Sequence, residues 1–115
     1  MTDQVTGQDL INELRALRDT LSLAIEKLKE RGKAKAKAEN GYRIALRKLI
    51  LEERDKGTPV TIISDICRGH EEIAKLKMNR DIAETLYETA QQKIYATKLE
   101  LGIVERQLEA ERKGL

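Results

Sequence analysis

The sequence predicts an all-α protein: a long antiparallel helical hairpin of the coiled-coil or helical-bundle type, with a short helix at the turn, that assembles into a homo-oligomeric bundle. The composition is that of long helices, because Phe and Trp are absent and three tyrosines supply all the aromatic volume. Apolar residues recur at alternating steps of three and four in both halves of the chain, as on one face of a helix. A glycine and a proline near the middle separate these halves.

The first element is predicted as one helix over about residues 7–56. Thr6 and Asp9 form a capping pair at its start, because the hydroxyl and the carboxylate satisfy free amide donors there. Each glycine inside a helix costs about 1 kcal/mol relative to alanine, so Gly32 and Gly41 leave open a break near or between them and a compact four-helix arrangement. We favour the continuous helix because its apolar stripe keeps phase across that interval. The stripe comprises Leu10, Leu14, Leu17, Leu21, Ala24 and Leu28, then Ala38, Tyr42, Ala45 and Leu49.

The chain is predicted to reverse after the first helix. Gly57 supplies a helix stop, Thr58 an N-cap and Pro59 the first residue of a new helix, which is the favoured order for ending one helix and beginning another. The new helix is short and apolar, covers about residues 59–68 and is closed by Gly69.

The last element is a helix over about residues 71–113, ended by Gly114. Its apolar residues fit one heptad frame, and a second apolar stripe runs beside the first. Two stripes on one helix indicate more than one neighbour, and a lone thin hairpin buries little surface, so we expect a single helical domain, residues 1–115, that forms dimers or tetramers. The frame comprises Ile73, Leu76, Ala83, Tyr87, Ala90, Ile94, Leu101, Val104 and Leu108, with Arg80 and Thr97 as polar members; the second stripe comprises Ile82, Leu86, Leu99 and Ile103.

The sequence lacks the usual signs of catalysis and metal binding. Cys67 is its one cysteine and His70 its one histidine, which rules out an intrachain disulfide, a cysteine cage and a two-histidine metal site. The glycines do not fit a phosphate-binding loop. We therefore expect no enzyme activity, no cofactor and no metal. The sequence has no run of about 18 apolar residues and no signal-peptide pattern, so we expect a cytoplasmic protein without a membrane span.

Basic residues concentrate in residues 27–48, which hold nine Lys or Arg against two Glu, a local net charge of +7 within a total of +2. One interpretation is an anion-attracting belt, with Lys33, Lys35 and Lys37 as candidate contacts to nucleic acid, nucleotide or an acidic protein. Their two-residue spacing points them to different sides of a helix, so we favour an ordinary solvated helix surface. An antiparallel hairpin folded near residues 57–70 would place this stretch opposite residues of about 79–100.

The turn segment is the second candidate binding region. Free amides at a helix start, together with the hydroxyls of Thr58 and Thr61, can hold an anion, and Arg68 and His70 would add charge-assisted contacts. The alternative, which we favour, is a capped connector whose apolar residues plug the end of the bundle. A helix-turn-helix is the weakest interpretation, because the short helix is not polar like a recognition helix. The apolar residues of this segment are Val60, Ile62, Ile63 and Ile66.

Residues 42–92 carry a resemblance to a known family. Two stretches carry it, GTPVTIISDICRG and the later IAKLKMNRDIAETLY. They resemble a family of small, mostly uncharacterised, all-helical proteins of phages and prophages of Gram-positive bacteria. The resemblance implies a phage provenance and a place in the host bacterial cytoplasm. It carries no agreed activity and no functional residues.

Three functions from different classes follow as hypotheses. The first, which we rank highest, is a non-enzymatic helical oligomer that acts by binding a host or phage protein. The second is a sponge that sequesters a nucleotide-type host defence signal near Thr58–His70 or the basic belt. The third is a nucleic-acid accessory protein of phage replication or recombination, which would bind with a steep dependence on salt.

Overall fold

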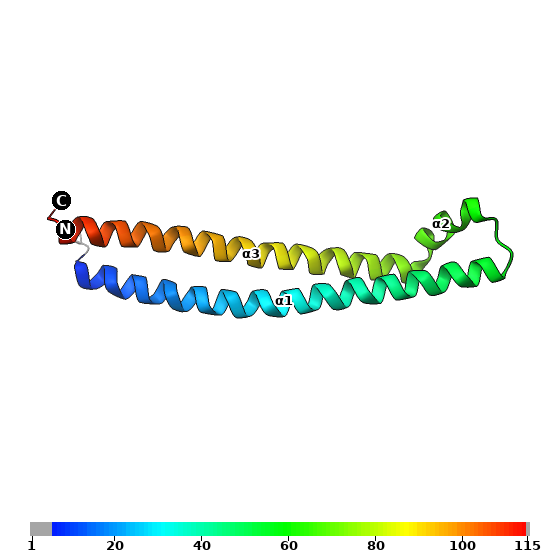
Figure 1. The fold of residues 1–115 in the computed structure, drawn as a ribbon, viewed down its shortest axis with the longest axis horizontal. Helices are drawn as coiled ribbons and strands as arrows, with labels where there is room; N and C mark the ends of the chain where they lie inside the picture. The colour runs from blue at the N-terminus through cyan, green and yellow to red at the C-terminus, as the bar shows by residue number, and fades with distance from the viewer. Residues whose placement is uncertain (1–5, 115) are drawn as a thin grey trace. The chain divides into compact units, whose positions relative to one another are not determined.

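The computed structural model describes residues 6–114 of the chain. Its helices are α1 (Gly7–Asp55), α2 (Val60–Gly69) and α3 (Glu71–Arg112), and no strand occurs among the described residues (Figure 1). The all-α class is therefore confirmed. In the described part of the chain no helix contains a segment that is long and apolar enough to cross a bilayer.

α1 begins with the predicted capping pair. The amide of Asp9 donates to Oγ1 of Thr6 at 3.1 Å, and the amide of Thr6 donates to Oδ2 of Asp9 at 3.1 Å. The amide of Thr6, more than its hydroxyl, holds the pKa of Asp9 below its ordinary value. From there the helix runs for 49 residues through Gly32 and Gly41, so the alternative of a break between two shorter helices is wrong.

Gly41→Ala is expected to raise the free energy of unfolding by about 1 kcal/mol, because alanine is the better helix former and a Cβ at this position meets no atom within 4 Å. Gly32→Ala should act similarly, since its Cβ would lie 3.5 Å from Cε2 of Tyr87, an ordinary contact. Chemical denaturation of each variant measures the effect. Gly57→Ala is the opposite control: φ is +80° there, so it should destabilise. A loss of stability in either helical variant would contradict the prediction.

In the chain reversal after α1, Gly57 has the predicted role of helix stop, whereas Thr58 does not have its predicted role of N-cap. The amide of Gly57 donates to the carbonyl of Arg54 at 3.0 Å and that of Thr58 to the carbonyl of Glu53 at 3.1 Å, the two bonds of a Schellman motif. α2 then begins at Val60, with Pro59 in the N-cap position and no side-chain cap bond. The predicted N-cap role of Thr58 is therefore wrong, because its hydroxyl donates instead to Oε2 of Glu53 at 2.7 Å.

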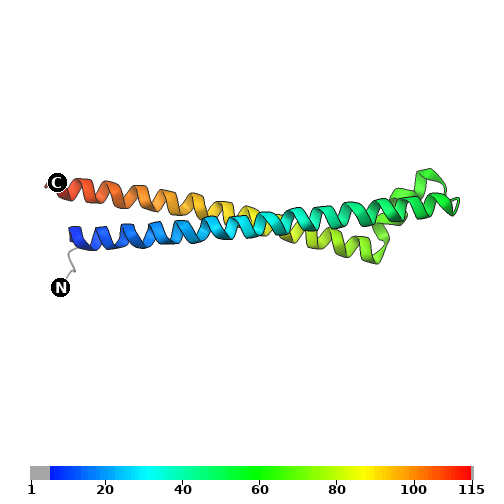
Figure 2. The same cartoon turned by 60° about the horizontal axis from the view of Figure 1, so that its bottom comes forward.

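The chain divides into two compact units. The first combines the described residues up to Lys29 with those from Thr89 onward. In it α1 and α3 run antiparallel and side by side, so that the start of α1 lies near the end of α3 (Figures 1 and 2). A Cβ placed on Gly7 would lie 3.0 Å from Oε1 of Glu111. The buried residues of this unit are Leu10, Ala24, Ala90, Thr97 and Val104.

The second unit is Glu30–Glu88 and contains α2. α1 and α3 are antiparallel here too: Lys35 of α1 contacts Tyr87, whereas Tyr42, two turns later, contacts the earlier Arg80. Both contacts join residues 27–48 to residues 79–100, so the approximate facing that the sequence predicts is confirmed. α2 lies beside the ends of α1 and α3 that it connects (Figures 1 and 2).

The predicted heptad frame of the last helix forms the packed face of α3. Each of its eleven positions is buried or half-buried, from Ile73 to Leu108. The polar member Thr97 is 2 % exposed, and its hydroxyl donates to the carbonyl of Lys93 at 2.7 Å, which removes the cost of burying it. The second stripe, in contrast, is exposed at Ile82, Leu86, Leu99 and Ile103.

α2 plugs the end of the helical pair less fully than predicted. Among its ten residues, all of them described, the buried ones are Ile63 and Cys67. Val60, Ile62 and Ile66 are exposed, so the expectation that all the apolar residues of this helix fill the end of a bundle is wrong for one chain. A short helix has one inward stripe, and Ile62 and Ile66 lie off it, whereas Val60 lies at the exposed end of the stripe, where it lines the same groove as Ile63 and Cys67.

Candidate functional site

The residues of the predicted tip are not brought together. The hydroxyl of Thr58 is engaged by Glu53, whose Oε1 also lies 3.6 Å from Nζ of Lys56. The backbone of His70 joins α2 to α3, since its amide donates to Cys67 at 3.2 Å and its carbonyl accepts from Ala74 at 2.9 Å. The side chain of His70 lines a hollow of about 600 Å³ together with Glu71 and Glu72, an unsuitable place for an anion.

Thr61 and Arg68 lie on α2, and both are exposed. Arg68 lines a different hollow from His70, so the predicted pair of charge-assisted contacts does not form one site. Thr61 is in the first turn of α2 and lines neither hollow. Arg68 lines its hollow together with the cations Arg54 and Lys77 and with no carboxylate.

Lys35 points to a different side of α1 from Lys33 and Lys37, which are one helical turn apart on the same face. Lys33 and Lys37 are exposed, whereas Lys35 is half-buried. Nζ of Lys35 lies 4.8 Å from the centre of the Tyr87 ring, a cation–π contact between α1 and α3. Lys35 therefore has a structural role in this unit, and no continuous row of three lysines exists.

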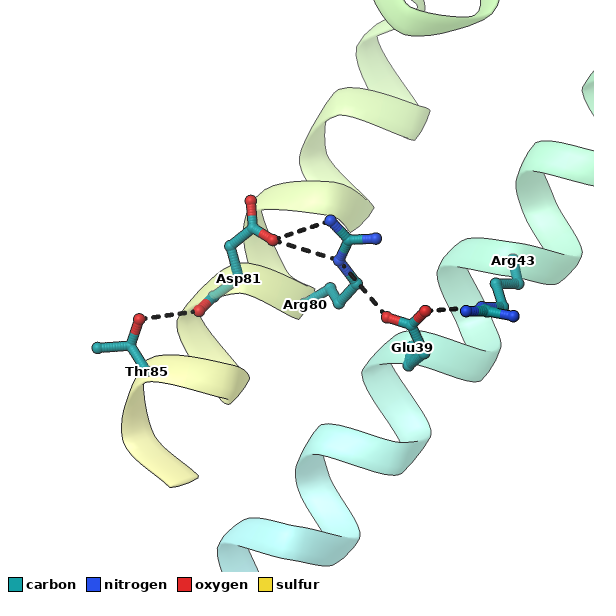
Figure 3. A network of polar contacts seen from close by, with 5 residues as sticks. All are labelled: Glu39, Arg43, Arg80, Asp81 and Thr85. Atoms are coloured by element: carbon teal, nitrogen blue, oxygen red, sulfur yellow. Dashed lines mark hydrogen bonds and ion pairs between the residues drawn. The ribbon is translucent and has the colours of Figure 1, made fainter. Parts of the chain in front are cut away.

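Arg80 is a further link between α1 and α3 (Figure 3). Its guanidinium carbon lies 4.6 Å from the centre of the Tyr42 ring, its Nε lies 3.5 Å from Oε2 of Glu39, and its Nη2 lies 3.1 Å from Oδ1 of Asp81. The hydrogen bond to Asp81 is the main cause that raises the already high pKa of Arg80. The other oxygen of Glu39 accepts from Arg43 at 2.6 Å. Arg80 thus compensates an acidic residue inside the basic belt.

A groove of about 760 Å³ lies in the second unit, and we call it the α2 groove. Its lining combines apolar side chains with cations from all three helices. The side chain of Cys67 is buried there, and burial raises the pKa of its thiol, with a smaller contribution from Glu53. The lining residues are Tyr42, Leu46, Ile50 and Arg54 of α1, Val60, Ile63, Ser64, Cys67 and Arg68 of α2, and Ile73, Ala74 and Lys77 of α3.

A second hollow of about 560 Å³ shares part of this wall. It also contains Tyr42, Leu46, Ile50 and Arg54, and adds Arg43, Arg47 and Arg80. The segment of α1 from Glu39 to Arg54 therefore contributes apolar side chains and arginines to the walls of both hollows. Glu39 is the acidic residue that lines it, and that carboxylate already lies within 3.5 Å of both Arg43 and Arg80.

Two stripes of large apolar side chains lie exposed on α3. The Met78 stripe, in the second unit, comprises Met78, Ile82 and Leu86, which are 38–54 % exposed. The Tyr95 stripe, in the first unit, comprises Tyr95, Leu99 and Ile103, which are 49–61 % exposed. Each set has a spacing of four residues and so follows one face of the helix. Exposed apolar rows of this kind are typical of surfaces that another helix covers.

Sequence reasoning missed Arg54, Lys77 and Met78. Arg54 continues the four-residue row of Tyr42, Leu46 and Ile50, and Lys77 follows Ile73 by one turn, so a search along four-residue rows would have found both. Their approach to Arg68 could not have been found in this way, because it depends on how α2 folds back.

The fold and these surfaces define the chain as a helical-hairpin protein with exposed apolar faces and a cation-rimmed groove. Among the described residues no group of three or more His, Cys, Asp or Glu side chains is placed to hold a metal ion. No family model, curated protein or solved structure gives a significant match to this chain. The resemblance to phage and prophage proteins accordingly stays a prediction.

Proposed function

We propose that the chain is a non-enzymatic protein that assembles into a homo-oligomeric helical bundle, a dimer or tetramer, and acts by binding another protein. The observation that carries this proposal is the exposure of the Met78 and Tyr95 stripes. Apolar surface gains about 25 cal/mol for each Å² removed from water. Six large side chains in two regular rows are therefore a strong driving force for association with further helices.

We further propose that the partner is a host or phage protein, because the resemblance of residues 42–92 implies a phage provenance. A small phage-type protein without catalytic groups acts by occupying a surface of a host or phage protein. The stripes and the α2 groove supply two kinds of surface, one for self-association and one for a partner. We place self-association on α3, because its exposed stripes are the more regular and the less charged.

Sedimentation velocity and light scattering of the purified protein test the oligomer directly. We expect a dimer or tetramer for wild type and a monomer of unchanged helicity for Met78→Lys/Ile82→Glu/Leu86→Lys or for Tyr95→Lys/Leu99→Glu/Ile103→Lys. The matched control, Asn79→Lys/Gln91→Glu/Gln92→Lys, places the same charges at exposed polar positions of α3 and should keep the wild-type mass. A wild-type monomer at high concentration would refute the self-association.

The two other functions make different predictions for the same samples. A nucleotide sponge would show a thermal shift with cyclic or linear nucleotides that Arg68→Ala abolishes. A nucleic-acid accessory protein would bind oligonucleotides with an affinity that falls steeply with salt. We rank both below protein binding, because Thr58 and His70 are not available beside Arg68 and because Lys35 is held by Tyr87.

A further inference from the structure

The α2 groove is lined by apolar side chains and by charged side chains of one sign. We call the charged ones the rim cations. Tyr42, Leu46 and Ile50 form one row along α1, and Ile63 of α2 lies among the lining residues opposite it. Three cations belong to the rim: Arg54, Arg68 and Lys77, one from each helix. None of its twelve lining residues, all described, is a carboxylate. A ligand that fits this groove must have an apolar side, with negative charges next to that side.

The rim cations are free to bind a partner. Among residues 6–114, the side chains of Arg54, Arg68 and Lys77 take part in no ion pair and no hydrogen bond. Glu53, the carboxylate that influences Cys67, is already engaged by Thr58 and Lys56. The three rim cations therefore form no ion pair with another side chain of the described residues.

The dimensions of the groove match a short helix. The row from Tyr42 to Arg54 spans three helical turns, or roughly 18 Å at 1.5 Å per residue. A helix that lies in such a groove inserts side chains at positions i, i+3 or i+4, and i+7. An extended nucleic acid would instead need aromatic rings for stacking, and one face of Tyr42 is already covered by Arg80.

We propose that the α2 groove binds an acidic amphipathic helix of a partner protein, with its apolar stripe against Leu46, Ile50 and Ile63 and its carboxylates beside Arg54, Arg68 and Lys77. This inference rests on the proposed protein-binding function and names the chemistry of the partner. A second copy of this chain that presented its Tyr95 stripe would be a poorer occupant, since Lys98 and Arg106 neighbour that stripe as well as Glu100.

A designed peptide of about four helical turns tests the proposal. The probe is fluorescein-labelled, with leucines at positions i, i+4, i+7 and i+11, glutamates flanking them and alanines elsewhere. Its control has lysine in place of every glutamate. We expect the acidic peptide to bind the full chain in fluorescence anisotropy at least about tenfold more tightly than the lysine peptide. Equal binding of both peptides, or none of the acidic one, would overturn the proposal.

Rim variants locate the binding. Arg68→Glu/Lys77→Glu is expected to weaken binding of the acidic peptide at least about tenfold. Lys75→Glu should leave the affinity unchanged, because Lys75 lines the hollow of His70 instead. Equal losses in both variants would refute the location. If the rim variant loses binding to anionic lipid vesicles or single-stranded DNA but not to the peptide, the groove serves another ligand and the proposal is wrong.

Sedimentation of the same samples separates this proposal from the oligomer. An oligomeric wild type that does not bind the acidic peptide would refute the groove proposal alone. A monomeric wild type that still binds the peptide would refute self-association alone. If Arg68→Glu/Lys77→Glu itself changes the oligomer mass, a second copy occupies the groove and the acidic-helix proposal is overturned.

Discussion

Ile63→Asp is expected to release α2 from α1 and α3 while the two long helices stay formed. α2 has ten residues, which is too short for a stable isolated helix in water. Its attachment depends on Ile63, 5 % exposed, and Cys67, 1 % exposed. Burial of an isoleucine contributes about 1.5–3 kcal/mol, and a buried carboxylate without a partner costs more than that. The balance therefore favours the detached state.

Hydrogen exchange and thiol labelling measure this release. Amides of α2 should lose protection, and Cys67 should react faster, since its buried thiol has a raised pKa in the native state. Each 1.4 kcal/mol lost corresponds to about a tenfold change in the opened fraction. Ile62→Asp is the matched control, because Ile62 is 45 % exposed on the same helix and should change neither readout. Equal effects of the two variants would show that α2 is not held by Ile63.

Arg80→Ala is expected to lower the free energy of unfolding by about 2 kcal/mol. The substitution removes the cation–π contact to Tyr42, worth about 0.5–1 kcal/mol. It also removes partly exposed ion pairs to Glu39 and Asp81, worth about 0.2–1 kcal/mol each. The packing of the arginine stem is lost as well. Urea denaturation followed by circular dichroism gives the value.

Arg80→Leu separates the roles of charge and volume at the same position. Leucine packs well at a heptad position, so the free energy of unfolding of this variant is expected to lie within about 1 kcal/mol of the wild-type value. Glu84→Ala, at an exposed position of the same helix, is the neutral control. If Arg80→Leu were as unstable as Arg80→Ala, the polar network of Figure 3 would stabilise the pair more than packing does.

The local features were predictable because they depend on neighbours in the sequence. Thr6 and Asp9 cap α1 as predicted, and Gly57 follows its end as the predicted glycine stop, in a Schellman motif. The three-four pattern identified the packed face of α3 down to its polar members, Arg80 and Thr97. These features follow from helix geometry and hydrogen bonding over a few residues.

The candidate site was predicted less well. Arg68 was named, and the structure places it on the rim of the α2 groove, but Thr58 and His70 are engaged elsewhere. The error at Thr58 has a physical cause. Helix α2 begins one residue later than predicted, with Pro59 in the N-cap position, and the hydroxyl of Thr58 donates a charge-assisted hydrogen bond to Glu53 of α1.

The sequence by itself determined that the chain is helical, where α1 and α3 begin and end to within about two residues, and which face of α1 and of α3 is packed. Only the tertiary structure decided the register that places Tyr42 against Arg80, the fold-back of α2 that brings Arg68 to Arg54 and Lys77, and which apolar residues stay exposed. The reason is that periodicity defines a face, whereas the choice of residues opposite that face is made by contacts between segments far apart in the chain.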